Sequence, residues 1–251
     1  MKNRKWSMLF LAATMAGSIQ LISCSKDTGT PANTAAGLDE TVVIIEKSTA
    51  PAGTDASASA CWLDNCINSL PVESLSQAEI DALTTMREEE LLAHDVYIQL
   101  YSLYNMPVFN NISKSETQHT LAIKALLLKY NLPDPAMDHV AGIFVNTDLQ
   151  ALYTALVAQG SVSLNAGLIV GATIEDLDIN DLHIHINTDV DNQDILFVFG
   201  NLEKGSRNHL RSFYTLLLKR GISYGPQFIS ADYFNQIVTS PYEIGSGPCP
   251  L

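Results

Sequence analysis

Basic residues are scarce in this 251-residue chain. It has 14 Lys and Arg residues against 27 Asp and Glu residues, which gives a formal net charge of −13. A nucleic-acid-binding domain would present a basic face, so this balance argues against a nucleic-acid partner. Two hydrolase motifs are also missing, because the chain contains neither Gly-x-Ser-x-Gly nor His-Glu-x-x-His.

Long apolar runs are scarce as well. One apolar stretch, Met8–Ser23, follows three basic residues and is too short to span a bilayer comfortably. This order is typical of a secretory signal. The stretch ends in Leu21-Ile-Ser-Cys24, which resembles the lipobox of bacterial lipoproteins. We therefore expect a signal peptide over residues 1–23 and lipidation of Cys24. The protein would be exported and anchored to the bacterial cell envelope, at the outer membrane or the periplasmic face; a soluble secreted protein is the alternative.

Only four cysteines are present, and Cys24 is the lipidation candidate. In an oxidising compartment the Cys61-x4-Cys66 spacing predicts a small disulfide loop. A structural zinc site is less favoured, because no second cysteine pair completes four ligands. Cys249 has no assigned role.

Composition divides the chain into four parts. After the signal peptide, residues 24–72 are rich in Ala, Thr, Ser, Gly and Pro, which is typical of a flexible tether. Helical periodicity begins at Glu73, so we place a helical domain at residues 73–240 and a tail at residues 241–251.

Four segments of the domain repeat apolar residues every three or four positions, the spacing of one helix face. They run from Leu83 to Tyr104, from Phe109 to Tyr130, from Leu164 to Leu182 and from Ile195 to Arg220. A short helix is expected at residues 147–158, within the long connection between the second and third segments, and another from Ser230 to Val238. The sequence therefore predicts an all-α fold.

The apolar face of each of these four segments is called a stripe below. Each stripe contains a carboxylate or an imidazole near its middle, where a leucine would pack better. These residues are Glu90, Glu116, His119, Glu175 and His209. A buried carboxylate is unfavourable unless it is paired or bound to a metal. One such residue alone is best explained as a satisfied polar group of the core. Four helices with the same feature favour convergence on one or two cations, and oxygen and imidazole ligands suit iron, manganese or zinc.

These residues resemble the ferritin-like superfamily of di-iron carboxylate bundles, in which two helices supply Glu and two supply Glu-x-x-His. Glu116-Thr-Gln-His119 is a complete Glu-x-x-His, and Glu90 followed by Tyr97 is similar to the first helix of rubrerythrins and bacterioferritins. The segment from Gly205 to Phe213 resembles a bacterial ferritin-like family known mainly as a domain of unknown function. The resemblance covers residues 76–238. It implies a ferritin-like four-helix bundle with a long crossover between helices two and three and a short C-terminal helix.

The fourth helix departs from that pattern, because Ser206 stands three residues before His209 where the family has Glu. Asp178 is the candidate substitute, since it lies one turn after Glu175 on the same helix face. A single-metal site, or a degenerate site that holds no metal, stays open.

Three other histidines have weaker signals. On a strand, His183 and His185 would point the same way, but on a helix they lie roughly 200° apart and cannot share a metal. Because the stripe through Leu182 is helical, both are expected at the surface. His139 lies in the crossover and has no evident partner.

The resemblance implies a di-iron oxidoreductase of the peroxidase or ferroxidase type, with two iron or manganese ions and a single ion as the alternative. Tyr97 would be a hydrogen-bond donor or a radical sink beside the metals. The partners would be a small-molecule oxidant or a metal ion, and the membrane through the lipid anchor; a homodimer is left open. The competing interpretation is a non-catalytic metal-binding or interaction module.

Overall fold

The computed structural model describes residues 65–245 and Cys249. The predicted signal peptide, Cys24 and Cys61 lie outside the described residues. None of the helices in the described part is long and apolar enough to cross a membrane.

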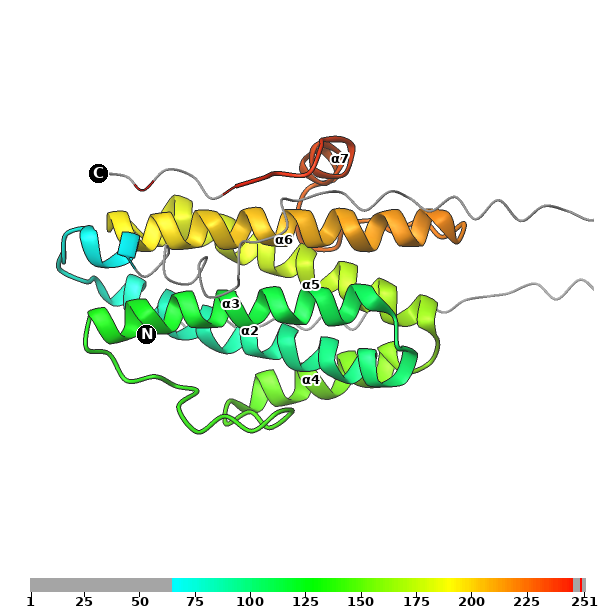
Figure 1. The fold of residues 1–251 in the computed structure, drawn as a ribbon, viewed down its shortest axis with the longest axis horizontal. Helices are drawn as coiled ribbons and strands as arrows, with labels where there is room; N and C mark the ends of the chain where they lie inside the picture. The colour runs from blue at the N-terminus through cyan, green and yellow to red at the C-terminus, as the bar shows by residue number, and fades with distance from the viewer. Residues whose placement is uncertain (1–64, 246–248, 250–251) are drawn as a thin grey trace, which may run out of the picture. The chain divides into compact units, whose positions relative to one another are not determined.

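Four long helices pack side by side (Figure 1). They are α2 (Gln77–Tyr104), α3 (Pro107–Lys129), α5 (Leu164–Ile184) and α6 (Gln193–Lys219). The most extensive contacts join α2 to α3 and α5 to α6. Each of these helices contains one of the four stripes that the periodicity predicted.

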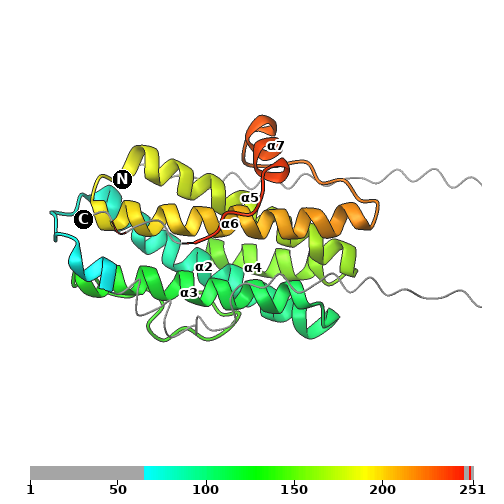
Figure 2. The same ribbon diagram turned by 45° about the horizontal axis from the view of Figure 1, so that its top comes forward.

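The connection from α3 to α5 is long and contains α4 (Thr147–Gly160), which packs against α2 and α5. After α6 the chain forms α7 (Ala231–Thr239), which lies on the outer side of α6 (Figure 2). The described residues contain no strand, and one isolated antiparallel bridge joins Val140 to Ile143. The prediction of an all-α bundle with a long crossover and a short C-terminal helix is confirmed.

Local sequence signals explain where the helices begin and end. Ser76 caps α2 by accepting a 3.1 Å hydrogen bond from the Glu79 N–H, while the Glu79 carboxylate accepts the Ser76 N–H at 2.8 Å. This reciprocal pair is a capping box. Asn105 ends α2 in the left-handed region, with φ 49°, and Pro107 begins α3. The two helices are therefore joined by a tight reversal.

The core consists of two apolar clusters. One includes Leu83, Met86, Ile123, Leu126 and Phe199, and the other includes Tyr97, Leu100, Phe109, Leu168 and Phe213. Along α2, the first cluster precedes Glu90 and the second follows it. The predicted metal ligands therefore occupy a polar layer between two apolar clusters.

The chain after α5 corrects one prediction. A single π turn, η1 (His185–Asp189), follows α5, and the Val190 N–H donates to the His185 carbonyl at 3.1 Å. A π turn accommodates an extra residue and so changes the direction of the side chains around it. His185 is buried, with Nδ1 2.7 Å from Asp189, whereas His183 is exposed. The surface placement is right for His183 and wrong for His185.

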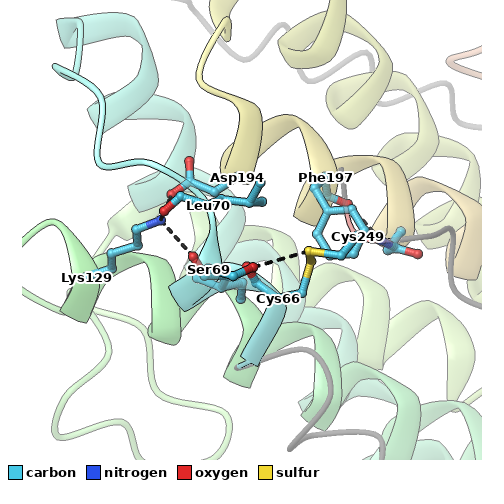
Figure 3. Close-up of a disulfide and its surroundings, with 9 residues drawn as sticks. Cys66, Ser69, Leu70, Lys129, Asp194, Phe197 and Cys249 are labelled. Carbon is cyan, nitrogen blue, oxygen red and sulfur yellow. Dashed lines mark hydrogen bonds and ion pairs between the residues drawn. A yellow bond between two sulfur atoms is a disulfide. The ribbon is translucent and has the colours of Figure 1, made fainter. Parts of the chain in front are cut away.

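The disulfide of the described chain joins Cys66 to Cys249, with their Cα atoms 5.6 Å apart (Figure 3). The predicted Cys61–Cys66 bond is therefore wrong. The two bonded cysteines are separated by 183 positions in the sequence, so spacing along the chain could not reveal the pair.

The folded part also begins earlier than predicted. Residues 65–69 are helical, and Ile67 and Leu70 are buried. The Lys129 ammonium donates to the carbonyls of Ile67 at 2.7 Å and Leu70 at 3.0 Å, and it pairs with Asp194 at 2.6 Å (Figure 3). The tether predicted for residues 24–72 is therefore too long at its C-terminal end.

Candidate metal centre

The five residues predicted as ligands meet in the polar layer. Potential ligand atoms of Glu90, Glu116 and His119 lie within 4.8 Å of one another, and so do those of Glu116, Glu175 and His209. All five side chains are buried. Glu116 belongs to both groups, so the two groups form adjacent sites that share one carboxylate.

Helix periodicity explains this convergence. Glu116 and His119 are three residues apart on α3 and therefore share a face. The Nδ1 atom of His119 lies 2.8 Å from a Glu116 oxygen and 3.0 Å from a Glu90 oxygen. From α6, the Nδ1 atom of His209 lies 2.9 Å from Glu116 and 3.3 Å from Glu175. Each imidazole thus presents Nδ1 to two carboxylates.

Ion pairing determines the charge state of this layer. Burial disfavours the imidazolium of His209, but the carboxylates of Glu116 and Glu175 outweigh it and raise the pKa of His209 to about 10. Burial opposes ionisation of Glu116 too, yet the two imidazolium groups hold its pKa well below the usual range. At Glu90, burial prevails over the attraction of His119 and raises the pKa to about 8. Protons on the imidazoles therefore balance part of the negative charge.

One buried oxygen of the layer has no such compensation. Glu90 Oε1 is inaccessible to solvent and has no hydrogen-bond partner among the described residues. A buried acceptor without a donor is unfavourable, and a cation would satisfy it. Three carboxylates and two imidazoles also match the ligand types that iron, manganese and zinc prefer. The residues present could hold a metal.

Ser115 is a functional candidate that the sequence did not reveal. Its hydroxyl lies 3.0 Å from Nε2 of His209, on the side of the ring opposite the carboxylates. A hydrogen bond at one ring nitrogen fixes which tautomer presents the other nitrogen to a metal. Ser115 precedes Glu116 in the chain and lies off the apolar stripe, so periodicity gave no signal for it.

Tyr97 lies where the sequence predicted. Its ring is fully buried, and its hydroxyl donates a hydrogen bond to the Glu175 carboxylate. Burial and the charges of Glu175 and Glu116 raise the pKa of Tyr97 well above the usual range, so the phenol stays protonated. Tyr97 therefore contacts a candidate ligand directly.

Asp178 does reach the place where the fourth helix lacks a glutamate. The Ser206 hydroxyl donates a hydrogen bond to the Asp178 carboxylate across the α5–α6 interface. Burial and the charges of Glu90 and Glu175 raise the pKa of Asp178 well above its usual range. Asp178 is in neither of the two groups of convergent ligand atoms. The structure therefore brings five predicted ligands together and places the sixth beside them.

Gly205 is a second residue that sequence reasoning missed. A Cβ atom at this position would lie 2.6 Å from Nε2 of His119, which is shorter than real contacts allow. Glycine thus permits α6 to approach the imidazole of α3. The requirement depends on which helix lies opposite, so it is invisible in the periodicity of α6 itself.

Comparison with known proteins identifies relatives over this whole region. A family model described as an uncharacterized protein domain, DUF2202, matches residues 79–241. The uncharacterized protein MJ0754 of Methanocaldococcus jannaschii is 48% identical over 179 residues, which are 71% of this chain and 96% of the relative. The crystal structure of the hypothetical protein MJ0754 from Methanococcus jannaschii superposes with a TM-score of 0.68 at 48% identity, covering 69% of this chain and 99% of that chain. All five convergent residues lie inside the region that the family model matches.

Proposed function

This chain belongs to the DUF2202 family, and we propose that it is an exported, membrane-tethered ferritin-like metalloprotein. It would bind iron or manganese between α2, α3, α5 and α6 and reduce dioxygen or peroxide. The observation that carries this proposal is the pair of buried ligand groups that share Glu116. Two adjacent groups with a common carboxylate are the arrangement that a two-metal centre requires.

The ligands divide naturally between two cations. Glu90 and His119 would hold one, Glu175 and His209 would hold the other, and Glu116 would contribute to both. Two redox-active cations bound there would supply the electrons that reduce an oxidant. Binding would displace the protons from the imidazole Nδ1 atoms, since a metal ligand must be deprotonated at the bonding atom.

The surrounding residues support this role. The Ser115 hydroxyl is hydrogen-bonded to Nε2 of His209, and this contact keeps Nδ1 of the same ring directed at Glu116 and Glu175. Tyr97 holds a proton at its hydroxyl and donates it in a hydrogen bond to Glu175. The apolar clusters pack on both sides of the polar layer and so help to keep the ligands buried.

Export and tethering are supported by the N-terminal sequence. The basic start, the apolar stretch over Met8–Ser23 and Cys24 together resemble a lipoprotein signal. Replacing Cys24 with alanine should release the protein from a membrane fraction or block its processing. Unchanged partitioning of that variant into detergent would contradict the lipid anchor.

A second candidate function is favoured by Ser206. Because a serine stands where the ferritin-like pattern has glutamate, the site has one carboxylate fewer on α6. A non-catalytic metal-binding or interaction module with a degenerate site, holding one cation or none, would fit this substitution. The Ser206–Asp178 hydrogen bond is compatible with either function.

Metal analysis of anaerobically purified protein separates the two candidates. We expect two equivalents of iron or manganese and measurable consumption of dioxygen or peroxide. Two results together would contradict the metalloprotein function and leave the interaction module: the protein takes up no iron, manganese or zinc, and none of these metals changes its melting temperature.

Ser206→Glu tests the degenerate-site alternative directly. The new carboxylate would replace the hydroxyl that donates to Asp178, so the metal-free variant should melt below the wild type because a further buried carboxylate without a counter-ion is unfavourable. The added ligand should instead increase the stabilisation by metal and, if the wild type holds one cation, raise the stoichiometry toward two. Equal metal content and equal metal-induced stabilisation in both proteins would show that position 206 does not reach the metals.

A further inference from the structure

A small pocket of about 30 Å³ lies between α2, α4 and α5. Most of the residues that line it are apolar: Leu92, Ala93, Leu152, Leu156, Ile174 and Leu177. Glu89 and Asp178 complete the wall. Four of the six apolar residues are buried, whereas Leu152 and Leu177 are partly exposed. The pocket therefore runs inward from the surface of the bundle.

The inner end of this pocket borders the candidate ligands. On α2, Ala93 lies three residues after Glu90 and therefore on the same helix face. On α5, Asp178 has the same relation to Glu175. The Asp178 carboxylate also accepts a hydrogen bond from Ser206, which is fully buried on α6. Asp178 thus extends from the wall of the pocket to the interior of the bundle.

Helix α4 forms one wall of the pocket, and hydrogen bonds fix the chain at both of its ends. Before α4, the Asp95 carboxylate of α2 accepts the Gly142 N–H at 2.6 Å and lies 2.8 Å from Nε2 of His139. His139 therefore has a partner, which its position in the sequence did not indicate. At the end of α4, the Tyr104 hydroxyl donates to the Gly160 carbonyl at 2.7 Å. These contacts hold α4 against α2 and so maintain the pocket.

The volume and the apolar wall limit which oxidant can occupy the pocket. One water molecule needs roughly 10–15 Å³ of such space, so this pocket has room for two heavy atoms but not for an organic hydroperoxide. Hydrogen peroxide is small enough, but its two hydroxyl groups would lose hydrogen bonds to water against an apolar wall. Dioxygen is diatomic and apolar, so its entry does not have this cost. Dioxygen is therefore the oxidant that the pocket fits best.

We propose that this pocket admits dioxygen to the polar layer, and that dioxygen rather than peroxide is the oxidant that the protein reduces. The inference rests on the proposed metalloprotein function, to which it adds the substrate and its route of entry. Three observations carry it: the small volume, the apolar wall, and the position of Ala93 and Asp178 one turn from candidate ligands.

Dioxygen is paramagnetic, so NMR spectroscopy of the metal-free full chain under dioxygen pressure tests the pocket without relying on metal or on activity. We expect dioxygen to accelerate the relaxation of the methyl protons of Ile174 and Leu156, which line the pocket. The effect on Leu149 and Leu126 should be much smaller, because these residues are also buried but do not line it. Equal acceleration at all four residues would overturn the proposal.

Two substitutions should change this relaxation in opposite directions. Ala93→Val places two further methyl groups in the pocket and should remove most of the acceleration at Ile174. Leu156→Ala enlarges the pocket and should increase it. Leu149→Ala is the matched control, because it makes the same change on α4 outside the pocket, and it should leave the relaxation at Ile174 unchanged. If Ala93→Val does not fold, the two α4 variants still decide, since equal effects of both at Ile174 would contradict the proposal.

The reaction of iron-loaded protein separates this inference from the function on which it rests. Ala93→Val should slow the oxidation of bound iron(II) by dioxygen and leave the metal content unchanged. An unchanged rate, or a wild type that reacts faster with hydrogen peroxide than with dioxygen, would overturn the inference and leave the metalloprotein function intact. Protein that binds no metal would contradict the proposed function instead, and the relaxation measurement would still decide whether dioxygen enters the pocket.

Discussion

Glu116 is the residue on which most of the polar layer depends. It contacts the Nδ1 atoms of both His119 and His209, and it is the member that the two ligand groups share. No other side chain of the layer contacts both imidazoles. Its replacement therefore affects both candidate metal positions at once.

We expect Glu116→Gln to lose most of the bound metal and the stabilisation that metal provides. Binding to the folded state alone contributes about 4 kcal/mol when free metal exceeds the dissociation constant a thousandfold. Metal content and melting temperature with and without added iron or manganese would measure the loss. Asp81→Asn removes one carboxylate charge from the surface and should preserve both quantities. Full metal content in Glu116→Gln would exclude Glu116 as the shared ligand.

The titration of the polar layer predicts how stability depends on pH. In the folded protein the pKa of His209 is raised to about 10 from the model-peptide value of 6.5. A raised histidine pKa contributes stability that is complete below about pH 6.5 and is lost as pH rises through the folded value. The raised pKa of Glu90 acts in the same direction at lower pH, because between about pH 4.5 and 8 the folded state keeps a proton on this carboxyl that the unfolded state has lost.

Metal-free protein should therefore lose stability steadily between pH 7 and 10, whereas metal-loaded protein should lose less. Denaturant unfolding of both forms across this pH range measures the difference. His209→Gln removes the contribution that extends over this whole pH range, so the stability of its metal-free form should depend less on pH. A metal-free protein whose stability rises over this range would contradict the assigned charge states.

At the scale of the helices, the sequence predicted both the elements and the positions of the ligands for one reason. Apolar residues every three or four positions mark the buried face, and polar residues on that face, such as Glu90 and Glu175, must then point inward. Features that depend on the opposing helix were not predictable in this way. Ser115 and Gly205 matter only because His209 and His119 lie against them.

Gly205→Ala tests the close approach of α6 to α3. The added methyl group would lie 2.6 Å from His119 Nε2, so the imidazole or the helix must move. We expect a lower melting temperature and weaker metal binding. Gly200 is the control on the same helix, because nothing lies within 4 Å of a Cβ atom there.

Gly200→Ala should stabilise the protein by roughly 0.5–1 kcal/mol, the usual gain when alanine replaces glycine inside a helix. The two variants should therefore shift the melting temperature in opposite directions. A shift of the same sign and size would mean that His119 is not constrained by α6.

At the scale of the whole molecule, contacts between residues far apart in the chain were the part of the fold that could not be predicted from the sequence. Cys66 has a neighbour five residues away in Cys61, yet its partner is Cys249 at the far end of the chain. Before it, Glu243 lies beside α6, where it pairs with Arg207 at 2.7 Å and Arg211 at 3.0 Å. Helix periodicity contains no information about such long-range pairs.

The disulfide closes a loop that contains nearly the whole described domain, so its removal should have a global effect. Cross-linking residues separated by 183 positions restricts the unfolded chain, and disulfides typically contribute about 2–4 kcal/mol. Cys249→Ser should lower the melting temperature and make it insensitive to reductant, while wild-type protein should lose the same stability when it is reduced. Metal content should change little, because Ile67, the residue next to Cys66, packs in the first apolar cluster rather than in the polar layer. A linked Cys61–Cys66 peptide in non-reduced wild type, together with an unchanged melting temperature in Cys249→Ser, would restore the local pairing that the sequence predicted.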